Sequence, residues 1–195
     1  MKKKRIDQLV VQLGLASDIK EAQALVMSGQ IVADDLRIDK AGFLVSENSF
    51  IRKKNASPYV SRGGFKLERG LKHFNINPEG FVCLDIGASS GGFSDCLLQR
   101  GAKKVYAIDV AYGQLDWKIR QDPKVTVMER FNARKIERKD LEDFPDLIVI
   151  DASFISLTKL LLPLSKLFKD PSLISIVPLI KPQFELPKES IGKNG

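Results

Sequence analysis

Four charged residues of this 195-residue sequence each stand at the end of an apolar run. They are Asp85, Asp109, Asp151 and Lys181, and the run Leu147–Ile150 before Asp151 is apolar throughout. Runs of that kind are typical of parallel strands covered on both faces. In an open parallel sheet, ligands bind at the edge formed by the carboxyl ends of the strands. The sequence therefore predicts an active site where three carboxylates and one ammonium group meet.

A glycine-rich loop lies between a predicted strand and a predicted helix in the segment Cys83–Phe93. Gly87, Gly91 and Gly92 lack a Cβ, so the backbone can turn tightly there and approach a ligand closely. The loop does not have the G-x-G-x-x-G spacing of dinucleotide sites, because Ala88 stands between Gly87 and the two serines. We therefore expect a nucleoside-type ligand with a small polar tail.

Two later positions fit the same ligand. Asp109 ends the next predicted strand, about 20 residues beyond the glycine loop, where a carboxylate can accept hydrogen bonds from ribose hydroxyls. The alternative is that Asp109 caps a helix. The small polar turn at Asn132 and Ala133 follows the third predicted strand and is placed to read an adenine edge.

Five short apolar runs alternate with helical patterns after residue 58 and are predicted as strands. They cover residues 81–84, 105–108, 125–128, 147–150 and 173–177. This order predicts an α/β fold with a Rossmann-like parallel sheet, whose last strand is an exposed edge open to association. A predicted helix that begins near Lys66 precedes the sheet, and a lysine on an amphipathic helix is by itself usually a solvated surface residue.

The first third of the chain carries nearly all of the excess positive charge. Residues 1–72 contain 14 Lys and Arg against 8 Asp and Glu, whereas residues 73–195 contain 17 against 16. This asymmetry suggests a polyanion-binding module joined to a nearly neutral domain. The alternative is a basic segment that is merely soluble.

Apolar spacing predicts a small α+β domain in this basic region. Two short helices within residues 6–13 and 19–28 are followed by short strands. The last two strands, around Leu44 and around Phe50, are expected to pair with each other. Arg52–Pro58 is basic and contains a proline, which indicates a linker. The two predicted domains are 1–58 and 59–195.

Several classes of protein are disfavoured by composition. Cys83 and Cys96 form no C-x-x-C pair and His73 is the only histidine, so we expect no metal site and no His-dependent acyl transfer. Residues 157–168 resemble a membrane segment, but they are short and interrupted by a proline and a lysine, which favours a helix packed on a sheet. We expect a cytoplasmic protein with reduced thiols and no membrane contact.

Four motifs of the N-terminal region match a known RNA-binding module: Arg5–Leu9, Ala22–Val26, Ser28–Val32 and Lys40–Gly42. On these motifs the region resembles the S4 domain, which implies RNA binding. The cations expected to contact phosphates, and so to give salt-sensitive affinity, are Lys3, Lys4, Arg5, Lys20, Lys53 and Lys54. Asp34-Asp35 replaces the Asn-Gly type turn usual in that family, and two acids near the RNA face are expected to weaken or redirect binding.

Five motifs of the second domain match one enzyme family: Ser61–Leu67, Leu84–Phe93, Asp109–Leu115, Asp151–Ser156 and Ile180–Glu185. On these motifs and the S4-like region, essentially the whole chain resembles the TlyA family, historically labelled haemolysins. The second domain of that family is similar to FtsJ-like RNA 2′-O-methyltransferases. The resemblance implies methyl transfer from S-adenosylmethionine to the ribose 2′-hydroxyl of cytidines, with ribosomal RNA or ribosomal subunits as partners.

The resemblance also implies roles for individual residues. Three members of the family's Lys-Asp-Lys-Glu tetrad match Lys66, Asp151 and Lys181. Two lysines close to each other and to a sulfonium cation disfavour further positive charge, so we expect their pKa values to be lowered. Lys181 is then the expected general base, with Asp151 orienting it and Lys66 positioning the hydroxyl. Arg62 is added to the RNA-binding residues. The expected cofactor contacts are Asp85, Gly87, Ala88, Ser89, Gly91, Gly92, Phe93, Asp109, Asn132 and Ala133.

The family's pattern continues beyond this sequence. The glutamate of the tetrad falls in that continuation, and Glu185 of the Lys-Pro-Gln-Phe-Glu motif does not take its place. We therefore expect a methyltransferase truncated at its C-terminus. The first alternative is a module that binds S-adenosylmethionine and RNA without turnover. The second, suggested by the historical label, is a membrane-lytic protein.

Overall fold

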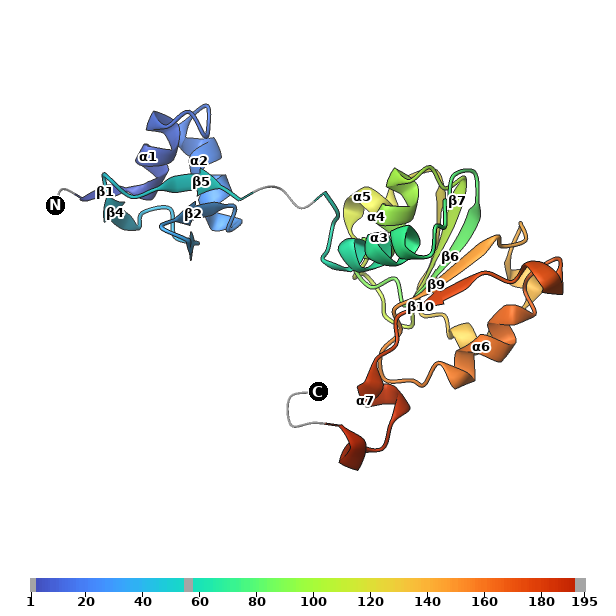
Figure 1. Cartoon of the computed structure of the whole chain (residues 1–195). Helices are drawn as coiled ribbons and strands as arrows, with labels where there is room; N and C mark the ends of the chain where they lie inside the picture. The colour runs from blue at the N-terminus through green and yellow to red at the C-terminus, as the bar shows by residue number, and fades with distance from the viewer. Residues whose placement is uncertain (1–2, 55–57, 192–195) are drawn as a thin grey trace. The chain divides into compact units, whose positions relative to one another are not determined.

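The protein consists of two compact units, Met1–Pro58 and Tyr59–Gly195, each with its own apolar core (Figure 1). The structure is a computed structural model, and it describes residues 3–54 and 58–191. The second unit carries the residues predicted to do chemistry.

The first unit contains two helices, α1 (Ile6–Gln12) and α2 (Ile19–Met27), as the apolar spacing predicts. Asp18 caps α2, since its carboxylate accepts a hydrogen bond from the Glu21 amide at 2.8 Å. The apolar faces of both helices pack on the short strands of the unit, which closes a core between them.

The strands of the first unit pair differently from the prediction. β2 (Ile31–Ala33) lies between β3 (Leu36–Ile38) and β5 (Ile51–Lys53), while β4 (Leu44–Ser46) pairs with β1 (Lys3–Arg5). The expected pairing of the segments around Leu44 and Phe50 is therefore wrong, because each packs its buried residue into the core from a different sheet. The predicted linker also begins too early, since Arg52 and Lys53 belong to β5.

The Asp34-Asp35 turn has a structural role. Both residues are left-handed, with φ of +47° and +64°, which is the backbone of a tight hairpin between β2 and β3. The Asp34 carboxylate accepts a hydrogen bond from the Phe50 amide at 2.8 Å, and the Asp35 carboxylate pairs with Arg52 at 3.0 Å. The two acids are therefore occupied by contacts within this unit.

The second unit is built on a five-stranded sheet in the order β10-β9-β6-β7-β8, and every pairing is parallel. The strands are β6 (Val82–Ile86), β7 (Lys104–Ile108), β8 (Val125–Met128), β9 (Leu147–Ile150) and β10 (Ile176–Pro178). This confirms the predicted α/β fold with about five strands. Within the described ranges, β10 is an edge strand paired with β9.

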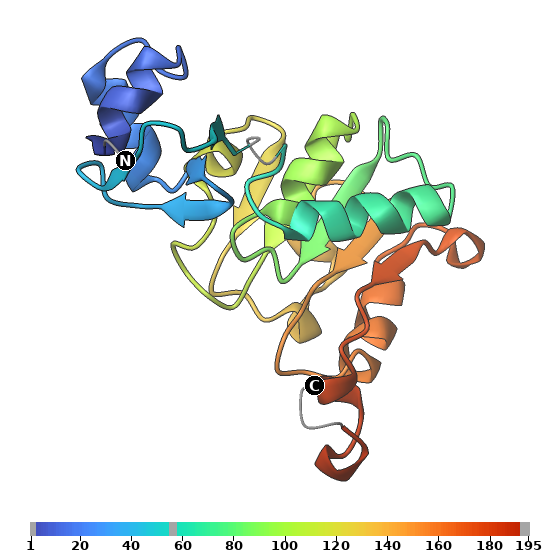
Figure 2. The same cartoon turned by 60° about the vertical axis from the view of Figure 1, so that its left-hand side comes forward.

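Helices cover both faces of this sheet. α3 (Gly63–His73) and α4 (Gly92–Gln99) lie side by side on one face, where they pack against Cys83 and Val105 (Figures 1 and 2). α6 (Thr158–Ser165) packs on the other face against Leu84 and Ile148. Alternate residues of each strand thus serve opposite cores, which explains why the runs are apolar without interruption.

The remaining helices are short. They are α5 (Trp117–Arg120), α7 (Pro182–Glu185) and the 3-10 helices η1 (Ala133–Lys135), η2 (Arg138–Asp140), η3 (Pro171–Leu173) and η4 (Lys188–Ser190). Two predictions here need correction. The strand predicted from Leu173 begins only at Ile176, because Asp170 caps the η3 turn. The helix expected from Gly113 begins at Trp117, where Asp116 caps it.

Candidate functional site

The charged residues at the strand ends meet at the carboxyl edge of the sheet. Asp109 and Asp151 follow β7 and β9 directly, and Lys181 is the third residue after β10. Two cavities open along this edge, and all described residues that line them belong to the second unit. The site thus uses the edge at which ligands bind in open α/β sheets.

Asp85 is the exception among the predicted residues. It lies within β6 and not at its end, it is fully buried, and it contributes to the lining of neither cavity. The Ser94 hydroxyl donates a hydrogen bond to its Oδ2 at 2.6 Å, while Oδ1 has no hydrogen-bond partner among the described atoms. Burial raises the pKa of this carboxyl to about 7.

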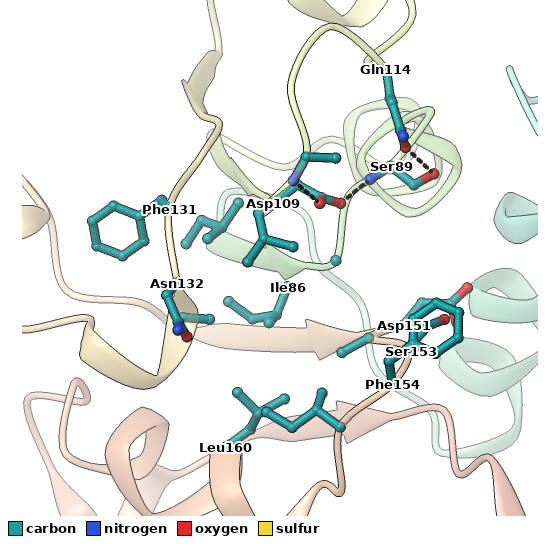
Figure 3. A pocket seen from close by; sticks show the side chains of 17 residues that line it. Ile86, Ser89, Asp109, Gln114, Phe131, Asn132, Asp151, Ser153, Phe154 and Leu160 are labelled. Carbon is teal, nitrogen blue, oxygen red and sulfur yellow. Dashed lines mark hydrogen bonds between the residues drawn. The ribbon is translucent and has the colours of Figure 1, made fainter. Parts of the chain in front are cut away.

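The first cavity has a volume of about 360 Å³ and lies between the loops after β6, β7, β8 and β9 (Figure 3). Phe131 and Asn132 lie at one end, and Asp151, Ser153 and Phe154 lie at the other. Apolar side chains form much of the wall between the two ends: Ile86, Ile108, Ala133 and Leu160. The cavity is therefore elongated, and its largely apolar walls carry a few polar side chains.

Asp109 holds the glycine loop in place at this cavity. Its Oδ2 accepts a hydrogen bond from the Ser89 amide and its Oδ1 accepts one from the Ala111 amide, both at 2.8 Å (Figure 3). A carboxylate has about four acceptor positions, so each oxygen can accept a second bond from a ligand hydroxyl. The next helix, α5, begins at Trp117 and is capped by Asp116, so Asp109 is not the cap of a helix here.

The glycines of the loop allow close approach within the protein itself. Gly87 has φ of +84°, and a Cβ there would lie 3.0 Å from the Asp151 carbonyl oxygen. A Cβ on Gly92 would lie 2.1 Å from the Ser61 hydroxyl. The loop therefore needs glycine to lie against the segment after β9 and the start of α3.

The second cavity, of about 820 Å³, is lined by cations. Arg62, Lys66 and Lys181 line it together with glycine-loop residues, among them Ala88, Ser90, Gly92 and Phe93. It shares four lining residues with the first cavity: Gly87, Ser89, Asp151 and Ser153. The two cavities are thus adjacent, with Asp151 in both linings.

A Lys-Asp-Lys cluster lies in this shared region. The Lys181 Nζ is 2.7 Å from Asp151 Oδ1, and it donates hydrogen bonds to the Ser153 hydroxyl at 2.8 Å and the Asp151 carbonyl at 3.1 Å. The Lys66 Nζ is 3.6 Å from Asp151 Oδ2, and its side chain is half exposed. Lys181 is thus held by three oxygens, whereas Lys66 remains open to the cavity.

Sequence reasoning missed several residues of the site. Ser153 contacts Lys181, and its signal is its position three residues beyond the end of β9, on the same edge. Phe131 lies in no matched motif and Gln114 lies in the Asp109–Leu115 motif, but the sequence does not indicate that either residue lines the first cavity. Gly91, which was predicted to contact the cofactor, lines neither cavity among the described residues and has Leu115 and Ile119 around it.

The predicted RNA-binding cations fall in both units. Lys3, Lys4 and Arg5 form β1, where Lys4 donates to Gln12 at 2.7 Å and Arg5 pairs with Asp7 at 2.6 Å. The other cations of the first unit are exposed: Lys20, Lys53 and Lys54. Arg62 lies in the second unit, in the lining of the cationic cavity.

Two classes of site are not found in the described part of the chain. Residues 3–54 and 58–191 contain no group of three or more His, Cys, Asp or Glu side chains that could hold a metal ion. The same residues form no helix that is both long and apolar enough to cross a bilayer. Cys83 and Cys96 are buried free thiols, and burial raises the pKa of Cys83 to about 12.

Comparison with protein families matches each unit separately. Residues 59–195 match the FtsJ-like methyltransferases, and residues 4–51 match the S4 domain.

Individual relatives match nearly the whole chain. The 16S/23S rRNA (cytidine-2′-O)-methyltransferase TlyA of Mycobacterium tuberculosis is 41% identical over 98% of this chain and 71% of its own length. Hemolysin A of Brachyspira hyodysenteriae is 40% identical over 98% of this chain and 79% of its own length. A solved structure from Streptococcus thermophilus, named for a hemolysin, has 44% identity and a TM-score of 0.69 over 98% of this chain and 70% of that one.

Proposed function

We propose, because the chain belongs to the FtsJ-like methyltransferase family, that it methylates the ribose 2′-hydroxyl of cytidine in ribosomal RNA with S-adenosylmethionine as the methyl donor. The observation that carries the proposal is the Lys66–Asp151–Lys181 cluster in the region shared by an apolar cavity and a cationic one. A methyltransferase must bring a donor and an acceptor together at such a point.

The residues of the first cavity fit S-adenosylmethionine. The Asp109 oxygens have acceptor capacity left for the two ribose hydroxyls, and Phe131 and Ile108 offer apolar contacts for an adenine ring. Asn132 and Ala133 would read the adenine edge, and Gly87 and Ser89 would hold the methionine end. When bound, the cofactor would supply a methyl group made electrophilic by a sulfonium sulfur.

The cluster supplies the proton chemistry. A ribose hydroxyl is a poor nucleophile, so it must lose its proton as the new O–C bond forms. We assign Lys181 as the general base, whose neutral amine would accept the hydroxyl proton, with Asp151 and Ser153 orienting its Nζ. Lys66, with its ammonium open to the cationic cavity, would position the hydroxyl or its neighbouring phosphate.

The first unit would supply affinity for RNA. Its exposed cations on β1, α2 and β5 can bind phosphates, a contribution that depends on salt and not on sequence. Arg62 would add a phosphate contact inside the cationic cavity. The proposed partner, which the rRNA methyltransferases among the relatives suggest, is ribosomal RNA, free or in a ribosomal subunit, and the reaction would take place in the cytoplasm.

A transfer assay tests the proposal. The full chain is incubated with S-adenosylmethionine carrying a labelled methyl group and with ribosomal subunits from cells that lack the modification, and labelled nucleosides are then identified by mass spectrometry. We expect label on the 2′-oxygen of cytidine. Calorimetric binding of cofactor and RNA without transfer would establish the binding module instead, and label on a base would overturn the assignment of the acceptor.

A further inference from the structure

Glu185 makes two contacts that no assigned role uses. It ends α7, and its Oε1 accepts a hydrogen bond from the Leu157 amide at 2.8 Å, while its Oε2 accepts one from the Ser156 hydroxyl at 2.7 Å. Both partners lie just before α6, 28 and 29 positions earlier in the sequence. Glu185 thus ties the segment after β10 to the loop after β9.

These two segments carry the general base and the carboxylate proposed to orient it. Asp151 and Ser153 lie on the loop after β9, and Lys181 lies on the segment after β10. A second bridge, between the rings of Phe154 and Phe184 with centroids 5.2 Å apart, joins the same segments. The distance from Lys181 Nζ to Asp151 Oδ1 depends on how these segments are held together.

The loop after β9 needs such support. Phe154 has a left-handed φ of +63°, which is costly for a residue with a bulky side chain and persists only where the surroundings fix it. Phe154 itself is 91% exposed, so apart from its contact with Phe184 the ring has little packing that could supply that support. The two hydrogen bonds to Glu185 anchor the other end of the loop.

We propose that Glu185 is a positioning residue that holds Lys181 against Asp151 and Ser153. It lines neither cavity among the described residues, so it would act through the two loops and not on the substrate. The consequence for catalysis rests on the proposed methyl transfer, whereas the consequence for the geometry of Lys181 does not.

Three variants separate this role from the alternatives. Glu185→Ala removes both acceptors, and Glu185→Asp is too short to reach both partners. Glu185→Gln keeps an acceptor for the Leu157 amide and can donate from its amide group to the Ser156 hydroxyl oxygen. Glu189→Ala, four residues later and exposed, is the matched control.

The first readout is turnover on ribosomal subunits. Because misalignment by about 1 Å can cost about 100-fold in rate, we expect Glu185→Ala and Glu185→Asp to lower kcat at least tenfold. The KM for RNA and the calorimetric Kd for S-adenosylmethionine should change less than about threefold, and Glu185→Gln should restore most of kcat. Equal losses in the Gln and Ala variants would show that the charge matters and would overturn the proposal, as would unchanged kcat in Glu185→Ala.

The second readout does not depend on activity. Brief treatment with acetic anhydride, followed by peptide mass spectrometry, gives the acetylation rate of Lys181 relative to the exposed Lys169 in the same molecule. Lys181 has 17% of its side chain exposed and three oxygen contacts, so it should react slowly in the wild type and several-fold faster in Glu185→Ala and Glu185→Asp. An unchanged relative rate in both variants would overturn the proposal even if the wild type transfers no methyl group.

Discussion

The two cavities at the carboxyl edge share four residues yet differ in charge. Among the described residues that line the first, the charged ones are Asp109 and Asp151, whereas those of the second are Asp151, Arg62, Lys66 and Lys181. An acidic, largely apolar cavity suits a cationic nucleoside ligand, and a cationic cavity suits a polyanion. One edge of one sheet thus presents two adjacent cavities of opposite charge.

The difference in charge between the two cavities depends on Asp151. Its two carboxylate oxygens face different lysines, at 2.7 Å from Lys181 and 3.6 Å from Lys66. It therefore offsets the positive charge of the second cavity at the point where that cavity adjoins the first. Substitutions in one cavity or the other should therefore affect methyl transfer and cofactor binding separately.

The largest effect is expected from Lys181→Ala. Loss of a general base costs typically 10²–10⁴-fold, so methyl transfer should fall by at least about 100-fold. The Kd for S-adenosylmethionine should stay within about threefold of the wild-type value, because Lys181 lines only the cationic cavity. Labelled transfer and calorimetry measure the two quantities, with Lys169→Ala as the control. Retained turnover would show that another group takes the proton.

The opposite result is expected from Asp109→Ala, namely weaker cofactor binding with little change in turnover. This change removes the acceptor for the Ser89 and Ala111 amides and for the proposed ribose hydroxyls. At about 1.5–3 kcal/mol for hydrogen bonds to a charged group, the Kd for S-adenosylmethionine should rise about 10- to 100-fold. Turnover at saturating cofactor should change little. A Kd within twofold of wild type, measured by calorimetry, would remove Asp109 from the cofactor site.

Sequence patterns predict the sheet correctly, but they do not predict how deeply each carboxylate is buried. Asp85 and Asp109 both follow an apolar run and so received the same interpretation. β6 continues to Ile86, however, so that Asp85 is a buried strand residue while Asp109 lies beyond its strand. Asp85 and Asp109 thus differ by two residues in their position relative to the strand end, and this difference, which residue type does not encode, decides their environment.

Tertiary contacts explain the other failures. Strands of three residues, such as β1 and β4, are too short for periodicity to specify a partner, so the fold of the first unit set their pairing. The sequence indicates only that Glu185 belongs to a motif. It does not indicate the contacts of Glu185, because its hydrogen-bond partners lie far away in sequence. Long apolar strands and glycine loops could be predicted because their signals are local.

A smaller effect, on the affinity for RNA, is expected when cations outside both cavities are substituted. The combined change of Lys3, Lys4 and Lys53 to Ala removes phosphate contacts proposed for the first unit. The affinity for ribosomal RNA should fall about tenfold at physiological salt, and log Kd should depend less steeply on log salt, because fewer counterions are released on binding. The kcat at saturating RNA should be unchanged. Filter binding across a salt series measures this, and an unaltered salt slope would exclude these lysines from the RNA interface.

The smallest effect on methyl transfer is expected from Asp85→Asn, since Asp85 lies outside both cavities. Its effect should instead appear in stability. Burial raises the pKa of Asp85 to about 7 from an ordinary value of 3.8, so the folded protein binds this proton more tightly than the unfolded chain does. The contribution of Asp85 to the free energy of unfolding is therefore full below the ordinary value. It falls by about 1.4 kcal/mol per pH unit as the pH rises towards 7, and is constant above that.

Carboxylates with lowered pKa values, such as Asp7, oppose this trend, so the wild type alone cannot isolate it. The difference in unfolding free energy between wild type and Asp85→Asn, measured by urea denaturation from pH 4.5 to 8, removes their contribution. That difference should decline with rising pH, because the asparagine is neutral throughout. A difference independent of pH would mean that Asp85 is ionised in the folded protein, and the buried carboxylate would then need a partner for its Oδ1.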